Sequence, residues 1–527
     1  MEPVFCLLQP ALRGALIVGL SLSVLAQTPT APDPSDLPSG RNVSDFSSTV
    51  LPPAFVPRPA SSPIPSTFWG IHVHNLSSYP LLVPYGQFRG WDGSAANWPK
   101  IAQSCNPSSP PTDACFYWVN LDAELKDVQA NDVFFTLSRT PPWAVTQEEQ
   151  DDSRCNYWNL GTAFHGACYP PVDLNLDGTG TDQIWRNWVA AIAIHVNAPN
   201  YAGAHIKYWE IWNEINRSGT LQYFSPPWSF EGTYDQLVRM AEDANCIITG
   251  RVQTISATQE SCQTVLTLVG LSASVDPNAV IVSPSTTAPA AITILQNFLY
   301  CSSSKHSCSY QDAGFNAVDV INVHFYATNK VQTPEYVASV QIPAVFGIAG
   351  GKPVWSGEGS WGNTLVPGNV WQDPYAQAGF IPRFFALYWS AGLTGNFWYG
   401  YDFANDGQLY DPTLLHLLEP QAEAWDLTNQ WLVNALPLNN PFCQPNGSIY
   451  HCDFTEASGR VASLVWDSRY GQNCSQLSNP IICGNTAYVV PPQFNLDWID
   501  LSGRMHSLSP VASTVTIGAN PILLEGK

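Results

Sequence analysis

The sequence predicts an α/β protein, a (β/α)8 TIM barrel followed by a small C-terminal all-β sandwich domain. Between residues 67 and 436, eight short apolar segments alternate with loops and amphipathic helical stretches, which is typical of parallel strands buried on both faces. After residue 436 the pattern changes to strands and turns with no helix between them. An open doubly wound sheet is the alternative, but no Gly-x-Gly-x-x-Gly turn follows an early strand.

The first residues predict an export signal. Residues 15–26 are small and apolar, follow Arg13 and end in Val-Leu-Ala, so we expect a cleaved signal peptide over residues 1–26 and a secreted or periplasmic protein. An uncleaved anchor is the alternative. The apolar run is short for a membrane span, and no later stretch reaches about 18 uncharged apolar residues, so we expect no stable membrane insertion. Residues 27–66 are rich in Pro and Ser and predict an extended linker.

Eight strands are predicted in the barrel segment, residues 67–436, which is longer than the roughly 250 residues of a typical barrel of this kind. The strands are expected at residues 68–73, 87–89, 133–138, 206–212, 280–284, 318–325, 354–358 and 394–399. A helix is predicted over residues 182–196, because Ile184, Trp188 and Ile192 recur at helical spacing. A last helix is expected at about residues 421–436.

The tail, residues 437–527, is predicted to form the sandwich. Its expected strands are residues 461–467, 487–490, 498–501 and 513–517. We find no catalytic constellation in this segment and assign it a packing or accessory role.

The cysteines predict disulfides in an oxidising compartment. Of 13 cysteines, Cys6 lies in the signal, which leaves an even number for pairing. Short staples between neighbours are the preferred connectivity: Cys105–Cys115, Cys155–Cys168, Cys246–Cys262, Cys301–Cys308, Cys443–Cys452 and Cys474–Cys483. Zinc binding is the alternative, but Cys-x-x-Cys and paired Cys/His spacings are absent from the sequence.

Charge and composition restrict the ligand. With 42 acidic residues against 21 Lys plus Arg, the net charge is −21, which argues against a nucleic-acid partner. Twenty Trp and 21 Tyr in a chain with only 12% charged residues favour a neutral, polar ligand such as carbohydrate. We expect no cofactor, and the sequence leaves the oligomeric state open.

Two acidic residues stand at predicted strand ends, where barrel proteins carry their functional groups. Glu214, preceded by Asn213, ends the fourth strand, and Glu358 ends the seventh. A pair of carboxylates that flank one bond is the requirement of glycoside hydrolysis. We therefore expect both glutamates to converge at the mouth of the barrel.

The run Trp-Glu-Ile-Trp-Asn-Glu at 209–214 and the run Trp-Ser-Gly-Glu-Gly at 355–359 resemble the acid/base and nucleophile segments of clan A glycoside hydrolases. Arg89 with Gly-Trp-Asp after it, Thr-Pro-Pro-Trp-Ala at 140–144 and His324-Phe-Tyr agree with this resemblance, which covers residues 68–436 and is most like family 39. The family 39 motif usually continues with proline, whereas Ile215 follows Glu214 here.

The resemblance implies a retaining hydrolase in which Glu214 is the general acid/base and Glu358 the nucleophile. It further implies that Asn213 binds the sugar 2-hydroxyl and that Arg89 and Tyr326 keep Glu358 ionised and oriented. Retaining enzymes hold the two carboxyls about 5–5.5 Å apart, and the acid requires a raised pKa.

Other side chains are candidates for binding substrate. Trp143, Trp361 and Trp398 are either sugar platforms or ordinary wall residues. His324, which either binds substrate or is a core histidine, lies on the strand face that also carries Tyr326. His72 and His74 point to one side of the first strand and are expected to bind sugar hydroxyls. His-x-His at this place also resembles the metal site of amidohydrolases, but the fifth strand lacks the histidine that this site needs. The alternatives to a glycosidase are a catalytically silent carbohydrate-binding protein and a metal-dependent barrel hydrolase.

Overall fold

The structure is a computed structural model. It describes residues 62–526, apart from 77, 93–96, 129–131, 156–161, 219–220, 222–228, 288–290, 303–307, 472, 495 and 509–513. The predicted signal peptide and residues 27–61 of the predicted linker lie outside the described residues. Ile64, near the end of that linker segment, is buried, and its amide donates to the Ala435 carbonyl at 3.0 Å.

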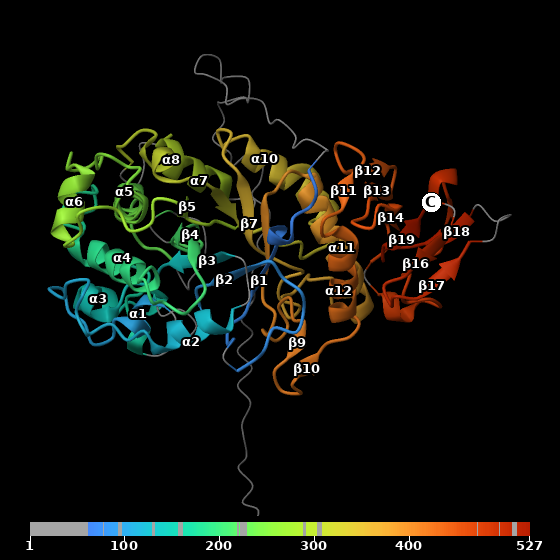
Figure 1. Cartoon of the computed structure of the whole chain (residues 1–527), viewed down its shortest axis with the longest axis horizontal. Helices are drawn as coiled ribbons and strands as arrows, with labels where there is room; N and C mark the ends of the chain where they lie inside the picture. The colour runs from blue at the N-terminus through green and yellow to red at the C-terminus, as the bar shows by residue number, and fades with distance from the viewer. Residues whose placement is uncertain are drawn as a thin grey trace, which may run out of the picture. The chain divides into compact units, whose positions relative to one another are not determined.

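Eight parallel strands form the predicted barrel (Figure 1). They are β1 (Trp69–His72), β2 (Gln87–Gly90), β3 (Asp132–Leu137), β4 (Ile206–Ile211), β5 (Val280–Val282), β6 (Ile321–Val323), β7 (Val354–Gly359) and β8 (Gly395–Trp398). Strand β1 pairs with both β2 and β8, and a parallel bridge between Val282 and Val320 joins β5 to the start of β6. The sheet is therefore closed, and the open doubly wound alternative is wrong.

Helices surround the strands and connect one to the next. They are α1 (Trp98–Ile101), α2 (Val119–Asp127), α3 (Gln147–Gln150), α4 (Gln183–Val196), α5 (Tyr234–Thr249), α6 (Cys262–Leu268), α7 (Ala291–Tyr300), α8 (Ala313–Ala317), α9 (Pro334–Tyr336), η7 (Val337–Gln341), α10 (Ile342–Phe346), α11 (Pro374–Ser390) and α12 (Gln421–Leu432). Helix α4 matches the helix expected at 182–196, whereas α12 ends earlier than expected. A short hairpin of β9 (Tyr410–Asp411) and β10 (His416–Leu417) follows β8.

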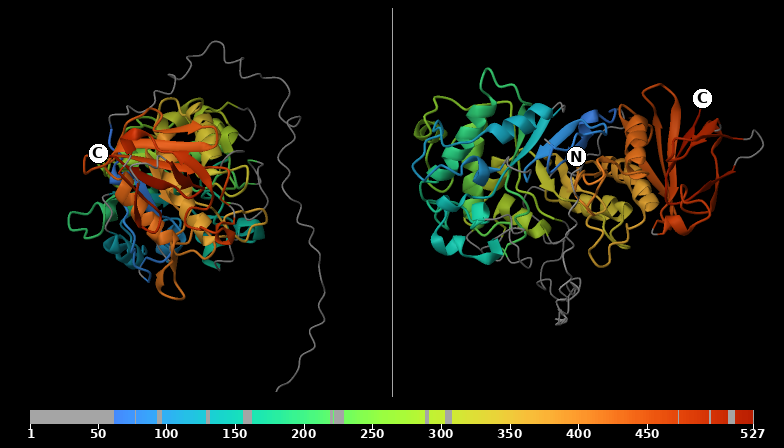
Figure 2. Two further views of the ribbon diagram at one scale, coloured as in Figure 1. Left: turned by 90° about the vertical axis from the view of Figure 1, so that its right-hand side faces the viewer. Right: turned by 90° about the horizontal axis from the view of Figure 1, so that it is seen from below.

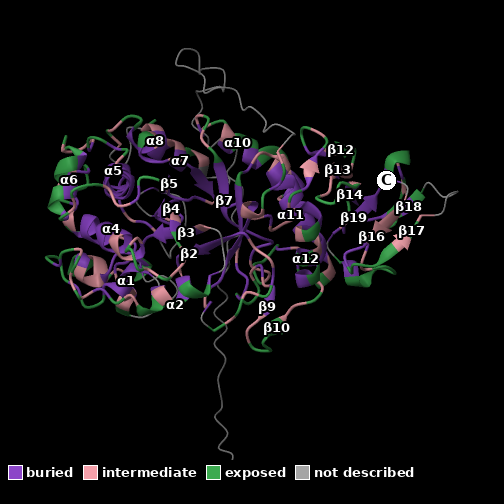
Figure 3. Ribbon diagram, viewed as in Figure 1, coloured by how far each residue is buried: buried purple, intermediate pink, exposed green. Residues whose placement is uncertain are grey.

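A layer of large side chains fills one level of the barrel interior. Phe134 of β3, Trp355 of β7 and Phe397 of β8 pack together there. Gly70 of β1 leaves the space for this layer, because a Cβ atom on it would lie 2.2 Å from the Phe397 ring. Figure 3 shows the buried interior of the barrel in purple. The barrel is a packed core rather than a channel, so functional groups must lie at its end.

Two antiparallel sheets follow the barrel, as expected for a sandwich. The larger sheet contains β11 (Leu436–Pro437), β12 (Cys443–Asn446), β13 (Ile449–Thr455), β14 (Val461–Asp467), β16 (Asp497–Ile499), β17 (Met505–Ser507) and β19 (Ile522–Glu525). The smaller sheet pairs β15 (Thr486–Val489) with β18 (Thr514–Ile517). Val465 and Leu524 of the larger sheet share a core with Val515 and Ile517 of the smaller one. Apolar side chains of both sheets thus meet, as in a sandwich.

Helices α11 and α12 lie between the barrel strands and the larger antiparallel sheet (Figures 1 and 2). Glu335 of α9 links the two parts: it accepts hydrogen bonds from Arg383 of α11 and from the Trp466 indole of β14, all at 2.8 Å. All three side chains are buried. A buried carboxylate that is fully hydrogen-bonded fixes the position of both partners.

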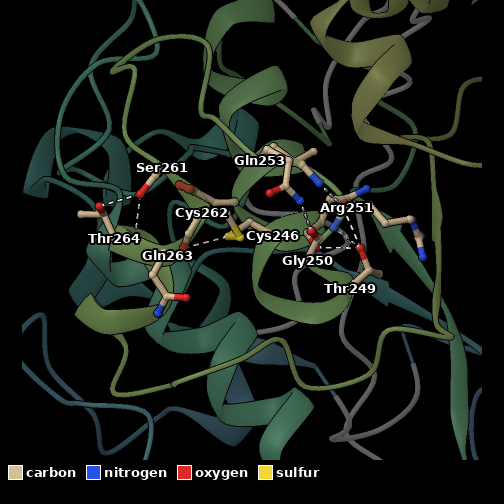
Figure 4. Close-up of a disulfide and its surroundings, with 12 residues drawn as sticks. Cys246, Thr249, Gly250, Arg251, Gln253, Ser261, Cys262, Gln263 and Thr264 are labelled. Atoms are coloured by element: carbon tan, nitrogen blue, oxygen red, sulfur yellow. Dashed lines mark hydrogen bonds between the residues drawn. A yellow bond between two sulfur atoms is a disulfide. The ribbon is translucent and has the colours of Figure 1, made fainter.

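All six predicted disulfides are present: Cys105–Cys115, Cys155–Cys168, Cys246–Cys262, Cys301–Cys308, Cys443–Cys452 and Cys474–Cys483. Figure 4 shows the bond between Cys246 and Cys262, which joins α5 to α6 beside the Ser261 cap of α6. This cysteine usage fits an oxidising compartment. Within the described part of the chain, none of the helices has the length and apolar character that crossing a membrane requires.

Candidate active site

Glu358 lies at the end of β7 and is held by one side chain from β2 and one from the segment after β6. Arg89 of β2 donates from Nη1 to Oε1 of Glu358, and the Tyr326 hydroxyl donates to Oε2 at 2.9 Å. Burial, the largest cause, and then the negative charge of Glu358 raise the pKa of Tyr326 well above its usual value, so this phenol stays a donor. The predicted contacts of Glu358 with Arg89 and Tyr326 are therefore present in the structure.

Glu214 follows β4 in a backbone conformation that is uncommon for a residue other than glycine. Its φ is 48°, and that of Trp212 is 82°. The Ser285 side chain fixes this turn: its Oγ accepts from the Glu214 amide at 3.0 Å and lies 3.3 Å from Oδ1 of Asn213. Such strained backbone is often found at functional sites. The turn directs both Asn213 and Glu214 toward the strand ends of the barrel.

The two glutamates converge on one imidazole. His324 follows β6, and its Nδ1 lies 3.1 Å from Oε1 of Glu214 and 3.2 Å from Oε2 of Glu358. One oxygen from each carboxylate and a His324 nitrogen all lie within 4.8 Å of one another. All three side chains are buried, with Glu214 6% and Glu358 3% exposed. Residues 144 positions apart in the chain thus form one compact cluster.

The pKa of Glu214 is lowered in this structure, which corrects the expected rise. Burial is the largest effect and raises the pKa, but the hydrogen bond and charge of His324, followed by the charges of Arg217 and Arg89, outweigh it. Arg217 lies 3.6 Å from Oε2 of Glu214. These positive neighbours of Glu214 were not predicted from the sequence.

Glu210 of β4 belongs to the same cluster, although the sequence analysis did not single it out. It is fully buried, and its Oε2 accepts from Nη2 of Arg89 at 2.7 Å. The Thr136 hydroxyl donates to Oε2 as well, and Asn322 donates to Oε1 at 2.9 Å. Period-two alternation places Glu210 on the face of β4 that points into the barrel, where a carboxylate needs a cation. That pattern was readable in the sequence.

His72 and His74 form a second polar cluster beside the first. Nδ1 of His72 donates to the backbone oxygen of Arg89 at 2.9 Å, and its Nε2 lies 2.6 Å from Asp92. His74 lies 3.2 Å from Asp402 and 3.0 Å from the Tyr399 hydroxyl. The two histidines also share Asp92, which lies 3.5 Å from His74, so they face one side as predicted. No role was predicted for Asp92, and Asp402 was not expected at this site.

The charges of this cluster support one another. Burial lowers the pKa of His74, but the carboxylates of Asp92 and Asp402 outweigh burial and raise this pKa to about 9. For Asp402, burial raises the pKa, and the hydrogen bond and charge of His74 reverse the direction, so the pKa is lowered. His74 is therefore a cation at neutral pH that lies between two anions.

Two groups of side chains have the donor atoms and spacing to hold a metal ion. His72, His74 and Asp92 form one group, and Glu214, His324 and Glu358 form the other. In the first group, the 2.6 Å between His72 and Asp92 is the length of a direct hydrogen bond, and a metal between the two atoms would need about 2 Å to each. The first group therefore fits hydrogen bonding better than metal binding.

The three tryptophans predicted as sugar platforms pack within or against the hydrophobic core. Trp361 and Trp398 are 1% and 0% exposed and pack edge-to-face in the core, at 4.9 Å between ring centroids. Trp143 is half-buried, donates to the Ala102 carbonyl at 2.8 Å and packs against the core. A stacking platform needs an open ring face, so these predictions are wrong for Trp361 and Trp398 and unsupported for Trp143.

A small pocket adjoins the cluster next to Asn213. Trp91 and Arg139 line it, and the Arg139 guanidinium lies 4.6 Å from the centroid of the Trp91 ring. Trp91 directly follows the Arg89-Gly90 end of β2, so its position after a barrel strand was the signal that marked it. An aromatic ring beside hydrogen-bonding groups is a usual lining for a polar organic ligand.

Comparison with known proteins supports the fold. No family model and no curated protein matches the sequence. Among the solved structures that are similar to this chain are two glycoside hydrolases. A family 39 glycoside hydrolase from the gut symbiont Bacteroides cellulosilyticus WH2 is 12% identical, with a TM-score of 0.52, covering 88% of this chain and 81% of that one. A glucosidase from Croceicoccus marinus is 13% identical, with a TM-score of 0.50, covering 88% and 97%. Known glycoside hydrolases therefore share the fold of this protein, a (β/α)8 barrel followed by an antiparallel β domain.

Proposed function

We propose that this protein is a secreted retaining glycosidase of the clan A type, with Glu214 as general acid/base and Glu358 as nucleophile. The observation that carries this proposal is the approach of the two carboxylates to one His324 nitrogen, at 3.1 and 3.2 Å. Retaining enzymes hold their carboxyls about 5–5.5 Å apart, and inverting enzymes about 6.5–9.5 Å. A separation within 4.8 Å between oxygens of Glu214 and Glu358 favours the retaining class.

In the first step, Glu214 donates its proton to the leaving oxygen while Glu358 attacks the anomeric carbon and forms a covalent glycosyl-enzyme. In the second step, Glu214 takes a proton from water, and the water displaces Glu358. Arg89 and Tyr326 support this assignment, because each donates a hydrogen bond to one oxygen of Glu358 and together they orient it. Glu214 has to gain a proton before the first step, which acidic pH favours because its pKa is lowered.

The surrounding groups support a carbohydrate substrate. The hydrogen bonds that Asn213 makes to Arg89 and Ser285 both use its Oδ1, so its Nδ2 is oriented to donate to a hydroxyl such as the sugar 2-hydroxyl. His74, which is half-buried, is proposed to bind a further hydroxyl. The predicted role of His72 is not proposed again, because this side chain is fully buried and both its nitrogens bond to Arg89 and Asp92. Trp91 lines the pocket beside Asn213, and its side chain is buried. The six disulfides agree with secretion.

The test is hydrolysis of a panel of aryl glycosides, with the anomer of the first product followed by proton NMR. We expect hydrolysis of at least one glycoside with retention. Glu358→Ala should abolish turnover, whereas Glu214→Ala should regain activity on an activated aryl glycoside when azide is added, because azide needs no general base. Glu148→Ala, which removes an exposed carboxylate on α3, is the matched control. Binding of sugars with no hydrolysis, or equal rates for Glu358→Ala and wild type, would refute the proposal.

A further inference from the structure

Arg89 is shared between two carboxylates, only one of which has a place in the proposed reaction. Its Nη1 donates to Glu358, and its Nη2 donates to Glu210 at 2.7 Å and to Asn213 at 2.9 Å. Arg89 and Glu210 are both fully buried. One positive charge therefore serves two negative charges in a part of the barrel from which water is excluded.

Side chains in the interior of the barrel bind both carboxylate oxygens of Glu210. Thr136 and Asn322 donate to its two oxygens, and Gly357 of β7 makes room for Asn322, because a Cβ at Gly357 would lie 2.4 Å from the Asn322 amide. The Arg89 guanidinium in turn lies 5.2 Å from the Phe134 ring centroid, on the apolar layer. Protein groups occupy both oxygens of Glu210, so it is not placed to touch a substrate.

A carboxylate in such a position costs free energy and needs a reason. A neutral glutamine would have a similar shape and would still accept from Thr136. It would lack the negative charge that Glu210 places beside Nη2 of Arg89. In a site of low effective dielectric, that charge weakens the attraction between Arg89 and any second anion bound to Nη1.

We propose that Glu210 is a positioning residue that moderates the hold of Arg89 on Glu358 and thereby sets how basic Glu358 is in the reaction. This inference rests on the proposed retaining function. A glutamate held too strongly by a full positive charge is a poor nucleophile in the first step but a good leaving group in the second. Glu210 balances the two steps by taking part of the Arg89 charge.

The proposal is tested by measuring the formation and the hydrolysis of the glycosyl-enzyme separately. In Glu210→Gln, formation of the glycosyl-enzyme should slow about tenfold, and its hydrolysis should become faster. The acid limb of kcat/KM against pH should move down by about one pH unit. The probe is the 2,4-dinitrophenyl 2-deoxy-2-fluoro glycoside of the sugar that the panel identifies, with trapping and reactivation followed by intact-protein mass spectrometry.

Two further variants separate an effect of the Glu210 charge from an effect on folding. Glu210→Asp retains the charge and should restore the acid limb to its wild-type position. Thr136→Val removes a hydrogen bond from Oε2 of Glu210, which strengthens the pull of Glu210 on Arg89, so trapping should become faster and the acid limb should move up. This opposite shift tests the proposal even if Glu210→Gln does not fold.

The outcomes are distinguishable. If Glu210→Gln or Thr136→Val changes both steps by the same factor and leaves the acid limb in place, Glu210 is only structural and the inference is overturned. If the wild-type protein forms no covalent adduct with any fluoro glycoside and hydrolyses no aryl glycoside, the proposed function itself has failed. Unequal changes in the two steps, with opposite signs in the two variants, would support the inference.

Discussion

Nδ1 of His324 lies 3.1 Å from Oε1 of Glu214, and this contact helps to hold the pKa of Glu214 below its usual value. Burial acts in the opposite direction and remains when the imidazole is removed. We therefore expect His324→Phe to raise the pKa of Glu214 and to move the basic limb of kcat/KM to higher pH by about one unit. Rates measured from pH 3 to 8 provide the test, with His451→Phe in β13 as control. A limb that stays in place or moves down would contradict this account.

The pKa of His74, about 9, predicts how stability depends on pH. Its pKa is raised above the 6.5 of the unfolded chain, so the stabilisation is complete below pH 6.5 and is lost as the pH rises through 9. Its size is about 3 to 4 kcal/mol, at about 1.4 kcal/mol for each pH unit between these two values. His74→Gln should therefore destabilise strongly at pH 6 and weakly at pH 10. Urea unfolding at both pH values measures the difference, and an equal loss at each would be evidence against the charged pair.

Trp398 should act on stability rather than on substrate affinity. It is fully buried, and its indole donates to the Gly407 carbonyl at 2.6 Å. Trp398→Phe removes that hydrogen bond and leaves a cavity, so we expect a loss of about 2 kcal/mol in stability and little change in KM. Thermal melting and steady-state kinetics separate these effects. A several-fold rise in KM with unchanged melting would restore Trp398 as a sugar platform.

The disulfide between Cys246 and Cys262 joins α5 to α6 and closes a loop of 16 residues. Cross-linking a loop of this size is worth about 3 kcal/mol, chiefly through the unfolded chain. The double variant Cys246→Ala with Cys262→Ala should lose about that amount in urea unfolding. Aryl glycoside hydrolysis at low temperature should be unchanged, since neither cysteine belongs to the glutamate cluster. A loss below 1 kcal/mol would show that packing between the two helices is sufficient.

A chelator distinguishes the glycosidase from a metal-dependent hydrolase. The proposed chemistry uses only Glu214 and Glu358, so dialysis against EDTA should leave aryl glycoside hydrolysis unchanged. If His72, His74 and Asp92 held a required metal, activity would fall and would return with zinc or manganese. His72→Gln is assayed in parallel. It shows whether the cluster of His72, His74 and Asp92 supports hydrolysis in a way that does not depend on a metal.

The barrel was predictable because strands buried on both faces are short apolar runs, and all eight were found within a few residues of their observed ends. The sandwich was harder. Strand β19, for example, is four residues long and gives little periodicity. At the site, Glu214 and Glu358 followed from their position at the ends of predicted strands, whereas Glu210 was missed because it lies before the end of its strand. Trp361 was misassigned because its position in the sequence does not show whether its ring faces the core or the mouth of the barrel.

The disulfides join residues that are close in the sequence, whereas closure of the barrel joins strands that are far apart in it. The disulfides span between 7 and 16 residues each, so each can form soon after its own loop has been synthesised. Strands β1 and β8, in contrast, join Trp69 to Asn396. Each disulfide can therefore form during synthesis before β8 is available to pair with β1. Because the disulfides join only residues that are close in the sequence, none of them would stabilise a barrel with wrongly paired strands.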